Sequence, residues 1–223
     1  MNYTTLGIMN KNKKMHIGFI GLGIMGKPMV MNLINAKIKV YFYARKKNVI
    51  KEVEGVGGTF VSKISDIPKN VNIIITNLPK TIDVEKVVIG KDGLINNLNR
   101  NHIVIDMSTI SPQKTIHMNN ILKKKDSFFL DAPVSGGEAG AISGKLSIMV
   151  GGDKRAYLKV KDILSIIGEK ITYIGSSGSG QICKACNQVM VAQTIQSISE
   201  IITIAKKSKI NPAVIRTALL AGY

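Results

Sequence analysis

A chain of 223 residues, 45% of them hydrophobic, is long enough for one sizeable domain and part of a second, and its composition excludes a disordered chain. It has no apolar run of about 18 residues and no apolar segment near the early Lys11, Lys13 and Lys14, so we expect a cytoplasmic protein without membrane partners. The net charge of +17 suggests nucleic-acid binding, but only four of the 31 basic residues are arginine and tryptophan is absent, so we expect no specific nucleic-acid partner.

Short β-branched runs alternate with amphipathic segments from residue 15 to residue 174. This alternation predicts an α/β fold, with a doubly wound and mostly parallel sheet that helices cover on both faces. The expected strands are 16–21, 39–43, 71–76, 102–107, 127–131, 146–150 and 171–175. A helix is expected over 25–35, and another begins at Ser111 with Pro112 in its first turn.

The chain changes character after Gly178. Residues 181–207 contain neither glycine nor proline and carry apolar residues on most faces, which predicts a long helix buried on several sides. Asn211 and Pro212 predict the start of one more helix. We therefore divide the chain into an N-terminal extension (1–14), an α/β domain (15–176) and the first helices of an incomplete all-α C-terminal domain (177–223).

A glycine-rich loop follows the first expected strand and precedes the first expected helix. Its first glycine allows a tight turn, its second lets the backbone approach a pyrophosphate, and its third lets the helix pack closely on the strand. The helix N-terminus would face the anion. This pattern predicts a Rossmann-type dinucleotide site; a turn that binds no ligand is the alternative. The loop consists of Gly21, Leu22, Gly23, Ile24, Met25 and Gly26.

The end of the second expected strand bears on the choice of cofactor. A site for NAD usually places Asp or Glu there to bind the ribose hydroxyls. This chain has Arg45 and Lys46 instead, and both side chains could bind a 2′-phosphate. We therefore expect NADP in preference to NAD.

Cys183 and Cys186 form a C-x-x-C pattern, which occurs in redox and zinc sites. The chain has no second cysteine pair, and its three histidines lack metal-ligand spacing. We therefore expect small residues on a packed helix and no metal site.

Two further segments are candidates for chemistry. Residues 131–137 follow a strand and offer consecutive backbone N–H groups and a hydroxyl, which suit a carboxylate; a simple turn is the alternative. Lys184, Asn187 and Gln188 share one face of the long helix. A lysine beside two amides at the start of an apolar helix is unusual for a solvated charge, but the spacing alone leaves a structural role equally open.

Five segments in this order resemble the β-hydroxyacid dehydrogenase family, namely 18–29, 76–79, 106–112, 131–153 and 178–188. The resemblance implies that Leu78 and Pro79 line the cofactor cleft, and that Ser108 and Thr109 lie beside the nicotinamide and its ribose. It also implies that the substrate carboxylate is held by Ser135, Gly136 and Gly137. Lys184 would be the catalytic residue, and Asn187 would help to orient the substrate, a task that Gln188 could share.

The activity that the resemblance implies is reduction of a small carboxylate-bearing aldehyde by NADPH or NADH. An ammonium group can stabilise the charge that develops on the oxygen and deliver the proton, if burial lowers its pKa. The segments 131–153 and 178–188 favour 2-hydroxy-3-oxopropionate, reduced to glycerate, over the alternative 3-hydroxyisobutyrate.

The end of the chain departs from the family pattern. Family members continue with helices that cover the long helix, complete the C-terminal domain and build a homo-oligomer. We therefore expect a C-terminally truncated member, in which the apolar faces over 189–205 lack that cover and form an exposed patch. A remnant that binds the cofactor without turnover stays open as an alternative, because any contact from beyond Tyr223 would be missing.

Overall fold

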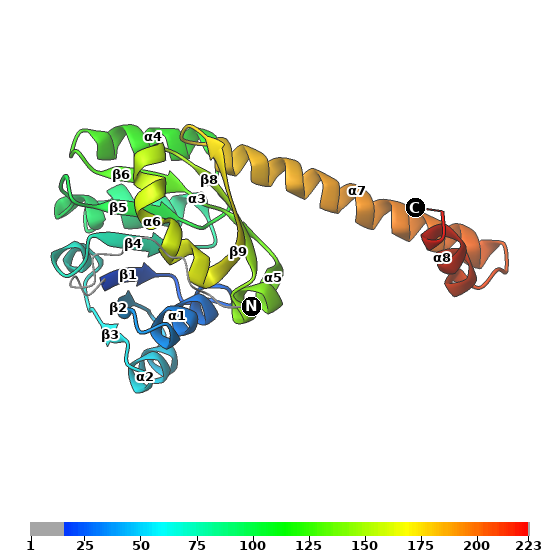
Figure 1. Cartoon of the computed structure of the whole chain (residues 1–223), viewed down its shortest axis with the longest axis horizontal. Coiled ribbons are helices and arrows are strands. Elements are labelled where there is room, and N and C mark those ends of the chain that lie inside the picture. The colour runs from blue at the N-terminus through cyan, green and yellow to red at the C-terminus, as the bar shows by residue number, and fades with distance from the viewer. Residues whose placement is uncertain (1–15, 223) are drawn as a thin grey trace, which may run out of the picture. The chain divides into compact units, whose positions relative to one another are not determined.

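The computed structural model describes residues 16–222 (Figure 1). The extension expected over 1–14 lies outside the described residues. The chain divides into two compact units, one that ends at Ile182 and one that begins at Cys183. The division falls inside helix α7 (Ser179–Lys207), whereas the sequence placed a domain boundary at residue 176. The first turn of α7 groups with the sheet because Gln181 hydrogen bonds to backbone groups that follow strand β5.

The strands of the first unit form one sheet in the order β3-β2-β1-β4-β5-β6-β8-β7, with β9 also paired to β8. The strands β3, β2, β1, β4, β5 and β6 are parallel to one another, in the strand order that dinucleotide-binding domains have. Strand β8 is antiparallel to β6 and β7. The bounds are β1 His16–Ile20, β2 Lys39–Tyr43, β3 Thr59–Phe60, β4 Ile73–Thr76, β5 Ile103–Asp106, β6 Phe128–Asp131, β7 Val134–Ser135, β8 Leu146–Gly151 and β9 Gly168–Gly175.

Helices cover both faces of this sheet (Figure 1). In β4, Ile75 belongs to one hydrophobic core and Ile74 to the other, because successive side chains point to opposite faces. The first core contains residues of α1 and α6, and the second contains residues of α3 and α4. The helices of this unit are α1 Gly26–Asn35, α2 Lys47–Gly55, α3 Thr81–Ile89, α4 Pro112–Lys123, α5 Gly137–Ser143 and α6 Lys154–Ile167, with short 3-10 helices η1 Ile64–Lys69 and η2 Leu94–Asn96.

This architecture confirms the α/β, doubly wound and mostly parallel fold. All seven expected strands form, and the hydroxyl of Ser111 caps α4 by accepting from the N–H of Lys114 at 3.3 Å. Strands β3 and β7 have two residues each, too short to give a pattern in the sequence.

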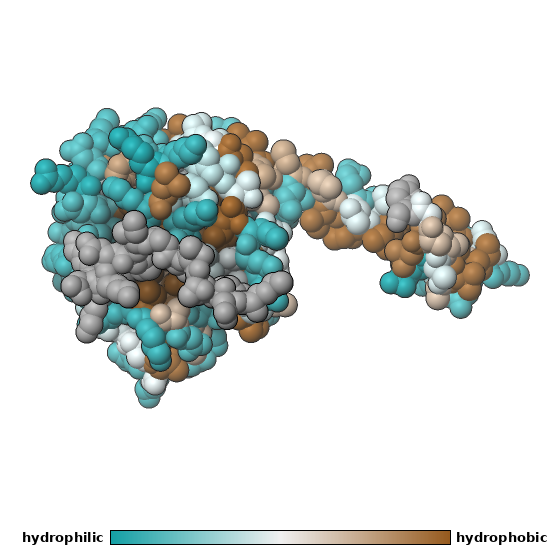
Figure 2. All heavy atoms as spheres, viewed as in Figure 1, coloured by the Kyte–Doolittle hydropathy of each residue, from teal (hydrophilic) through white to brown (hydrophobic). Residues whose placement is uncertain are grey.

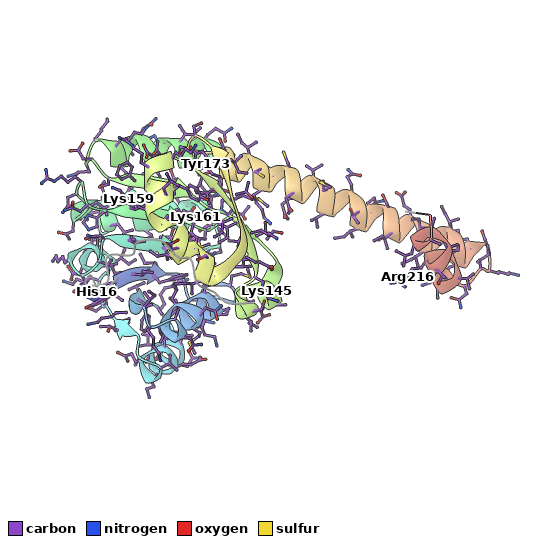
Figure 3. All side chains as sticks on the ribbon, viewed as in Figure 1. His16, Lys145, Lys159, Lys161, Tyr173 and Arg216 are labelled. Carbon is purple, nitrogen blue, oxygen red and sulfur yellow. The ribbon has the colours of Figure 1, made fainter. Side chains whose placement is uncertain are left out.

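Helix α6 packs on β9 and β6 through aromatic and basic side chains. The rings of Tyr157 and Tyr173 stack with their centroids 5.3 Å apart. On the same helix, the ammonium of Lys159 lies 5.7 Å from the centre of the Phe128 ring. Figure 3 labels Lys159 on α6 and Tyr173 on β9. These contacts connect α6 to β9 and to β6.

The second unit contains the rest of α7 and helix α8 (Pro212–Leu220). Both helices were expected, and the Asn211 side chain caps α8 by accepting from the N–H of Ala213 at 2.9 Å. The apolar residues of α7 are not buried on several sides, and the exposed patch expected over 189–205 is present: Val189, Met190 and Ile195 are each more than 60% exposed. Figure 2 shows hydrophobic side chains on the surface of α7 and α8. No described helix is long and apolar enough to cross a membrane.

We expect Ile75→Ala to lower the free energy of unfolding by roughly 2–5 kcal/mol, because Ile75 is fully buried in a central strand and the substitution leaves a cavity. Ile82→Ala is the matched control, since Ile82 is 51% exposed on α3 and the same change should shift stability by no more than about 0.5 kcal/mol. Urea titration measures both values. Equal losses would contradict the assigned core.

Candidate functional site

The loop between β1 and α1 contains two crowded glycines and one open one. Gly21 has a φ of +100°, and a β-carbon there would collide with the carbonyl oxygen of Asn77. A β-carbon on Gly26 would collide with the carbonyl oxygen of Gly21, so the helix starts directly against the loop. Gly23 is exposed, and a β-carbon there would meet no atom of residues 16–222 within 4 Å. The fold therefore requires Gly21 and Gly26, whereas Gly23 leaves free space beside the backbone.

The N-terminus of α1 has no side-chain cap and no acidic residue in its first turn. Helices α2, α3 and α5 also begin without a side-chain cap, whereas α4, α6 and α8 are capped by the side chains of Ser111, Asp153 and Asn211. In the first turn of α1, Pro28 has no N–H and the Lys27 N–H donates to the carbonyl of Gly23 at 3.0 Å, so the N–H of Gly26 is the group that could meet an anion. Together with the open Gly23, this geometry fits the pyrophosphate of a dinucleotide. Of the other loop residues, Leu22 and Met25 pack partly against the core, and Ile24 is 71% exposed.

The end of β2 carries exposed cations. Arg45 and Lys46 follow this strand, and both are exposed. A cavity of about 400 Å³ adjoins the last residue of the strand; its lining is Tyr43, Ser62, Lys63, Ile64, Ser65 and Asp92. Lys63 and two serine residues thus add polar groups that the sequence analysis did not select.

A hydrogen-bond network joins the ends of β4 and β5. The hydroxyl of Ser108 accepts from the N–H of Leu78 at 2.8 Å and donates to Asp106 Oδ1 at 2.6 Å. Thr76 donates to the same carboxylate oxygen at 2.8 Å. Ser108 is buried, whereas Thr109 and Pro79 are exposed. The structure therefore brings Leu78 and Ser108 together and exposes the two residues that follow them.

Asp106 is fully buried at the end of β5. Burial raises its pKa to about 7, although the hydrogen bonds from Ser108 and Thr76 oppose that shift. The neighbouring carboxylate of Asp131 raises it further. The second oxygen of Asp106, Oδ2, is buried without a hydrogen-bond partner among the described residues. A carboxyl group in this environment changes its charge near neutral pH.

Asp131 holds the start of α7. Its Oδ1 accepts from the N–H of Gly178 at 2.8 Å, and its Oδ2 accepts from the N–H of Gln181 at 3.1 Å. Burial raises the pKa of Asp131, and these N–H groups oppose the shift. The side chain of Gln181 in turn donates to the carbonyl of Ser108 at 2.8 Å and accepts from the N–H of Ile110 at 3.0 Å. The first turn of α7 is thereby hydrogen bonded to the ends of two strands.

The segment expected to bind a carboxylate contains the short strand β7 and the first turn of α5. Ser135 pairs with Ser147 of β8. Gly136 and Gly137 are exposed and have positive φ angles of 132° and 60°. Glu138 lies in the first turn of α5, so this segment offers backbone donors beside one negative charge.

Lys184 and Asn187 belong to the second unit, further along α7. Lys184 is only 8% exposed, and burial lowers the pKa of its ammonium below the ordinary value. The Asn187 side chain is half-buried, and its Nδ2 donates to the side-chain oxygen Oε1 of Gln188 at 3.1 Å. A buried lysine of lowered pKa can donate a proton more readily than a solvated one.

Cys183 and Cys186 are free thiols, the first half-buried and the second exposed. Between residues 16 and 222, the structure contains no group of three or more His, Cys, Asp or Glu side chains that could hold a metal ion.

The sequence analysis missed three buried residues of this site, Asp106, Asp131 and Gln181. A signal for the first two is present, because each is the last residue of an apolar parallel strand, where polar side chains of open α/β sheets meet ligands. Gln181 has no comparable signal, since its partners are backbone groups about 70 residues earlier in the chain.

We expect Asp106→Asn to remove a pH dependence of stability. The carboxyl has a pKa of about 7 when folded and 3.8 when free, so the folded state holds a proton that the unfolded state releases between these values. Wild-type stability should therefore fall, relative to the variant, as pH rises from about 4 to 7, by more than about 1.4 kcal/mol. The asparagine retains an acceptor for Ser108 and Thr76. Urea titration across pH measures the difference.

The control for that experiment is Asp162→Asn, which removes one exposed carboxyl from α6. A difference between wild type and Asp106→Asn that stays constant from pH 4 to 7 would contradict the raised pKa.

Comparisons with known proteins agree with this geometry. Residues 16–175 match a protein family described as the NAD binding domain of 6-phosphogluconate dehydrogenase. The 2-hydroxy-3-oxopropionate reductase of Escherichia coli (strain K12) is 38% identical over 209 residues, which are 94% of this chain and 71% of that protein. The mitochondrial 3-hydroxyisobutyrate dehydrogenase of Rattus norvegicus is 33% identical over 206 residues, 92% of this chain and 62% of that protein.

A solved structure, the 3-hydroxyisobutyrate dehydrogenase of Mycobacterium tuberculosis with L-serine, superposes with a TM-score of 0.83 at 29% identity. The match covers 89% of this chain and 67% of that one. The first unit is thus an NAD(P)-binding domain. The chain belongs to the β-hydroxyacid dehydrogenase family, which includes 3-hydroxyisobutyrate dehydrogenase, and is an NAD(P)-dependent oxidoreductase that acts on hydroxyl groups.

Proposed function

We propose that this chain reduces a small carboxylate-bearing aldehyde with NADPH, and that its substrate is 2-hydroxy-3-oxopropionate. The observation that carries the proposal is that Lys184 is buried and that this burial lowers its pKa. Lys184 lies on α7, and the first turn of α7 is hydrogen bonded to the segment after β5. The relative that is 38% identical bears the name of this reductase. Reduction to 3-hydroxyisobutyrate is the second candidate, supported by the relative that is 33% identical.

The cofactor would be held along the carboxyl ends of β1, β2, β4 and β5. The loop from Gly21 to Gly26 offers free space and the N-terminus of α1 to the pyrophosphate. Arg45 and Lys46 would bind the 2′-phosphate that distinguishes NADP from NAD. Four residues would line the nicotinamide side of the cleft, namely Leu78, Pro79, Ser108 and Thr109.

The substrate would be fixed by its carboxylate and reduced at its aldehyde carbon. Backbone N–H groups of Ser135, Gly136 and Gly137 would bind the carboxylate, and Asn187 would orient the substrate. A bound nicotinamide supplies the hydride that the aldehyde carbon accepts. Lys184 donates its proton to the oxygen, which becomes the new hydroxyl, and the neutral amine then takes a proton from water.

We expect Gly23→Ala to weaken NADPH binding without loss of stability. A β-carbon at this position meets no atom of the described residues within 4 Å, so the described fold tolerates it, but it fills the space that the pyrophosphate would occupy. The dissociation constant should rise roughly tenfold, about 1.4 kcal/mol. Calorimetric titration measures binding, and thermal melting checks stability. Gly55→Ala is the matched control, because a β-carbon there also meets nothing. An unchanged affinity for Gly23→Ala would place the cofactor elsewhere.

We expect the wild-type chain to oxidise NADPH, and NADH more slowly, when it is mixed with 2-hydroxy-3-oxopropionate. Lys184→Ala should lower the turnover rate by about 10²–10⁴-fold, because it removes the proton donor. Lys207→Ala removes an exposed lysine of the same helix and should leave the rate unchanged. The decrease in absorbance at 340 nm, roughly the nicotinamide maximum, follows the reaction.

The pH profile adds a second check on Lys184. Reduction requires the protonated amine, so kcat/KM should fall as pH rises through the lowered pKa of Lys184, below the ordinary 10.5. Lys184→Arg keeps its charge over this range and should lose the descending limb together with most of the rate. Equal turnover by wild type and Lys184→Ala would overturn the proposed role. Cofactor binding without turnover in any variant would indicate a cofactor-binding remnant.

A further inference from the structure

The side-chain amide of Gln181 spans the backbone on both sides of Thr109. Its nitrogen donates to the carbonyl of Ser108 at 2.8 Å, and its oxygen accepts from the N–H of Ile110 at 3.0 Å. A neighbouring strand would bond to the same two backbone groups. Gln181 is 2% exposed, so both hydrogen bonds form away from water, while Thr109 between them is exposed.

The backbone of Gln181 is held as firmly as its side chain. Its N–H donates to Asp131 Oδ2 at 3.1 Å, and the N–H of Gly178 donates to Asp131 Oδ1 at 2.8 Å. A carboxylate at a helix N-terminus is favourable because it meets the positive end of the helix dipole. The backbone from which the Gln181 side-chain amide extends is therefore held in place by Asp131 at the end of β6.

The segment that Gln181 holds is also fixed from its other side. The Ser108 hydroxyl accepts from the N–H of Leu78 and donates to Asp106. Ser108 is thus bound through its side chain to the ends of β4 and β5, and through its carbonyl to α7. Among the described side chains, Gln181 is the one that bonds this segment to α7.

We propose that Gln181 is a positioning residue: its amide couples the segment 108–110 to the first turn of the helix that carries Lys184. Lys184 follows three residues after Gln181 in the same continuous helix. A change in the direction of the first turn therefore changes the direction in which the lysine is presented, and a displacement of about 1 Å at a reacting group can cost about 10²-fold in rate. This inference rests on the proposed function, which places Thr109 and Lys184 on the reacting groups.

The test compares Gln181→Met, which keeps the shape and removes both hydrogen bonds, with Gln193→Met, the same change at an exposed position of α7. Gln181→Met should speed amide hydrogen exchange about tenfold or more at both Ile110 and Lys184. It should lower kcat by about 10–100-fold and change the NADPH dissociation constant and the substrate KM by less than about threefold. The control should match wild type in every measurement.

Gln181→Glu supplies a second variant with a pH signature. A protonated glutamic acid can still donate to the Ser108 carbonyl, whereas the carboxylate repels it, and the buried Asp131 and Asp106 on the neighbouring strands favour the protonated form. The ratio of its kcat to that of wild type should therefore be highest at low pH and fall as pH rises. A residue that acted only on stability would give a constant ratio.

The outcomes separate this inference from the proposed function. Unchanged exchange at Ile110 in Gln181→Met, or faster exchange there with kcat within about twofold of wild type, would overturn the positioning role. If wild type reduces no aldehyde, the proposed function fails, and the coupling is then judged by amide hydrogen exchange in Gln181→Met alone. Faster exchange at both Ile110 and Lys184 supports the coupling, whereas faster exchange at Ile110 only overturns it.

Discussion

The carboxylate of Asp131 is the group on which the arrangement of the site depends. It is buried at the end of β6, and its two oxygens accept the N–H groups of Gly178 and Gln181 at the start of α7. An unpaired carboxylate at this depth would be costly, so the helix start is held where its N–H groups can compensate the charge. Gly151 on β8 leaves the necessary space, because a β-carbon there would lie 2.7 Å from Asp131 Oδ2.

Asp106 lies directly opposite Asp131 on the neighbouring parallel strand. The two acids have different surroundings. Asp131 accepts backbone N–H groups of Gly178 and Gln181 at the start of α7. Asp106 accepts hydrogen bonds from two hydroxyl groups and the Ser108 N–H, all at Oδ1, and its Oδ2 has no partner among the described residues. Burial beside a second carboxyl raises the pKa of Asp106 to about 7. The strand ends thus combine one carboxylate that organises a helix with one acid that organises Leu78 and Ser108.

Most of the fold could be predicted from the sequence because its signals are local. β-Branched runs marked seven of the strands, and Ser111 and Asn211 marked the starts of two helices. Strands β3 and β7 could not be predicted, because two residues make no periodic pattern and pair only when neighbouring strands present their edges. The burial of α7 could not be predicted from its own residues, because an apolar helix sequence shows a need for partners but not which residues cover it.

The sequence by itself determined the parallel sheet, the glycine loop after β1 and the family, because these depend on residue order and spacing. It also placed a lysine near the start of a long apolar helix. Only the tertiary structure decided which polar groups are buried and what they bind. The partners of Asp131 lie about 50 residues along the chain and those of Gln181 about 70, and no local pattern connects positions that meet only after the strands have paired.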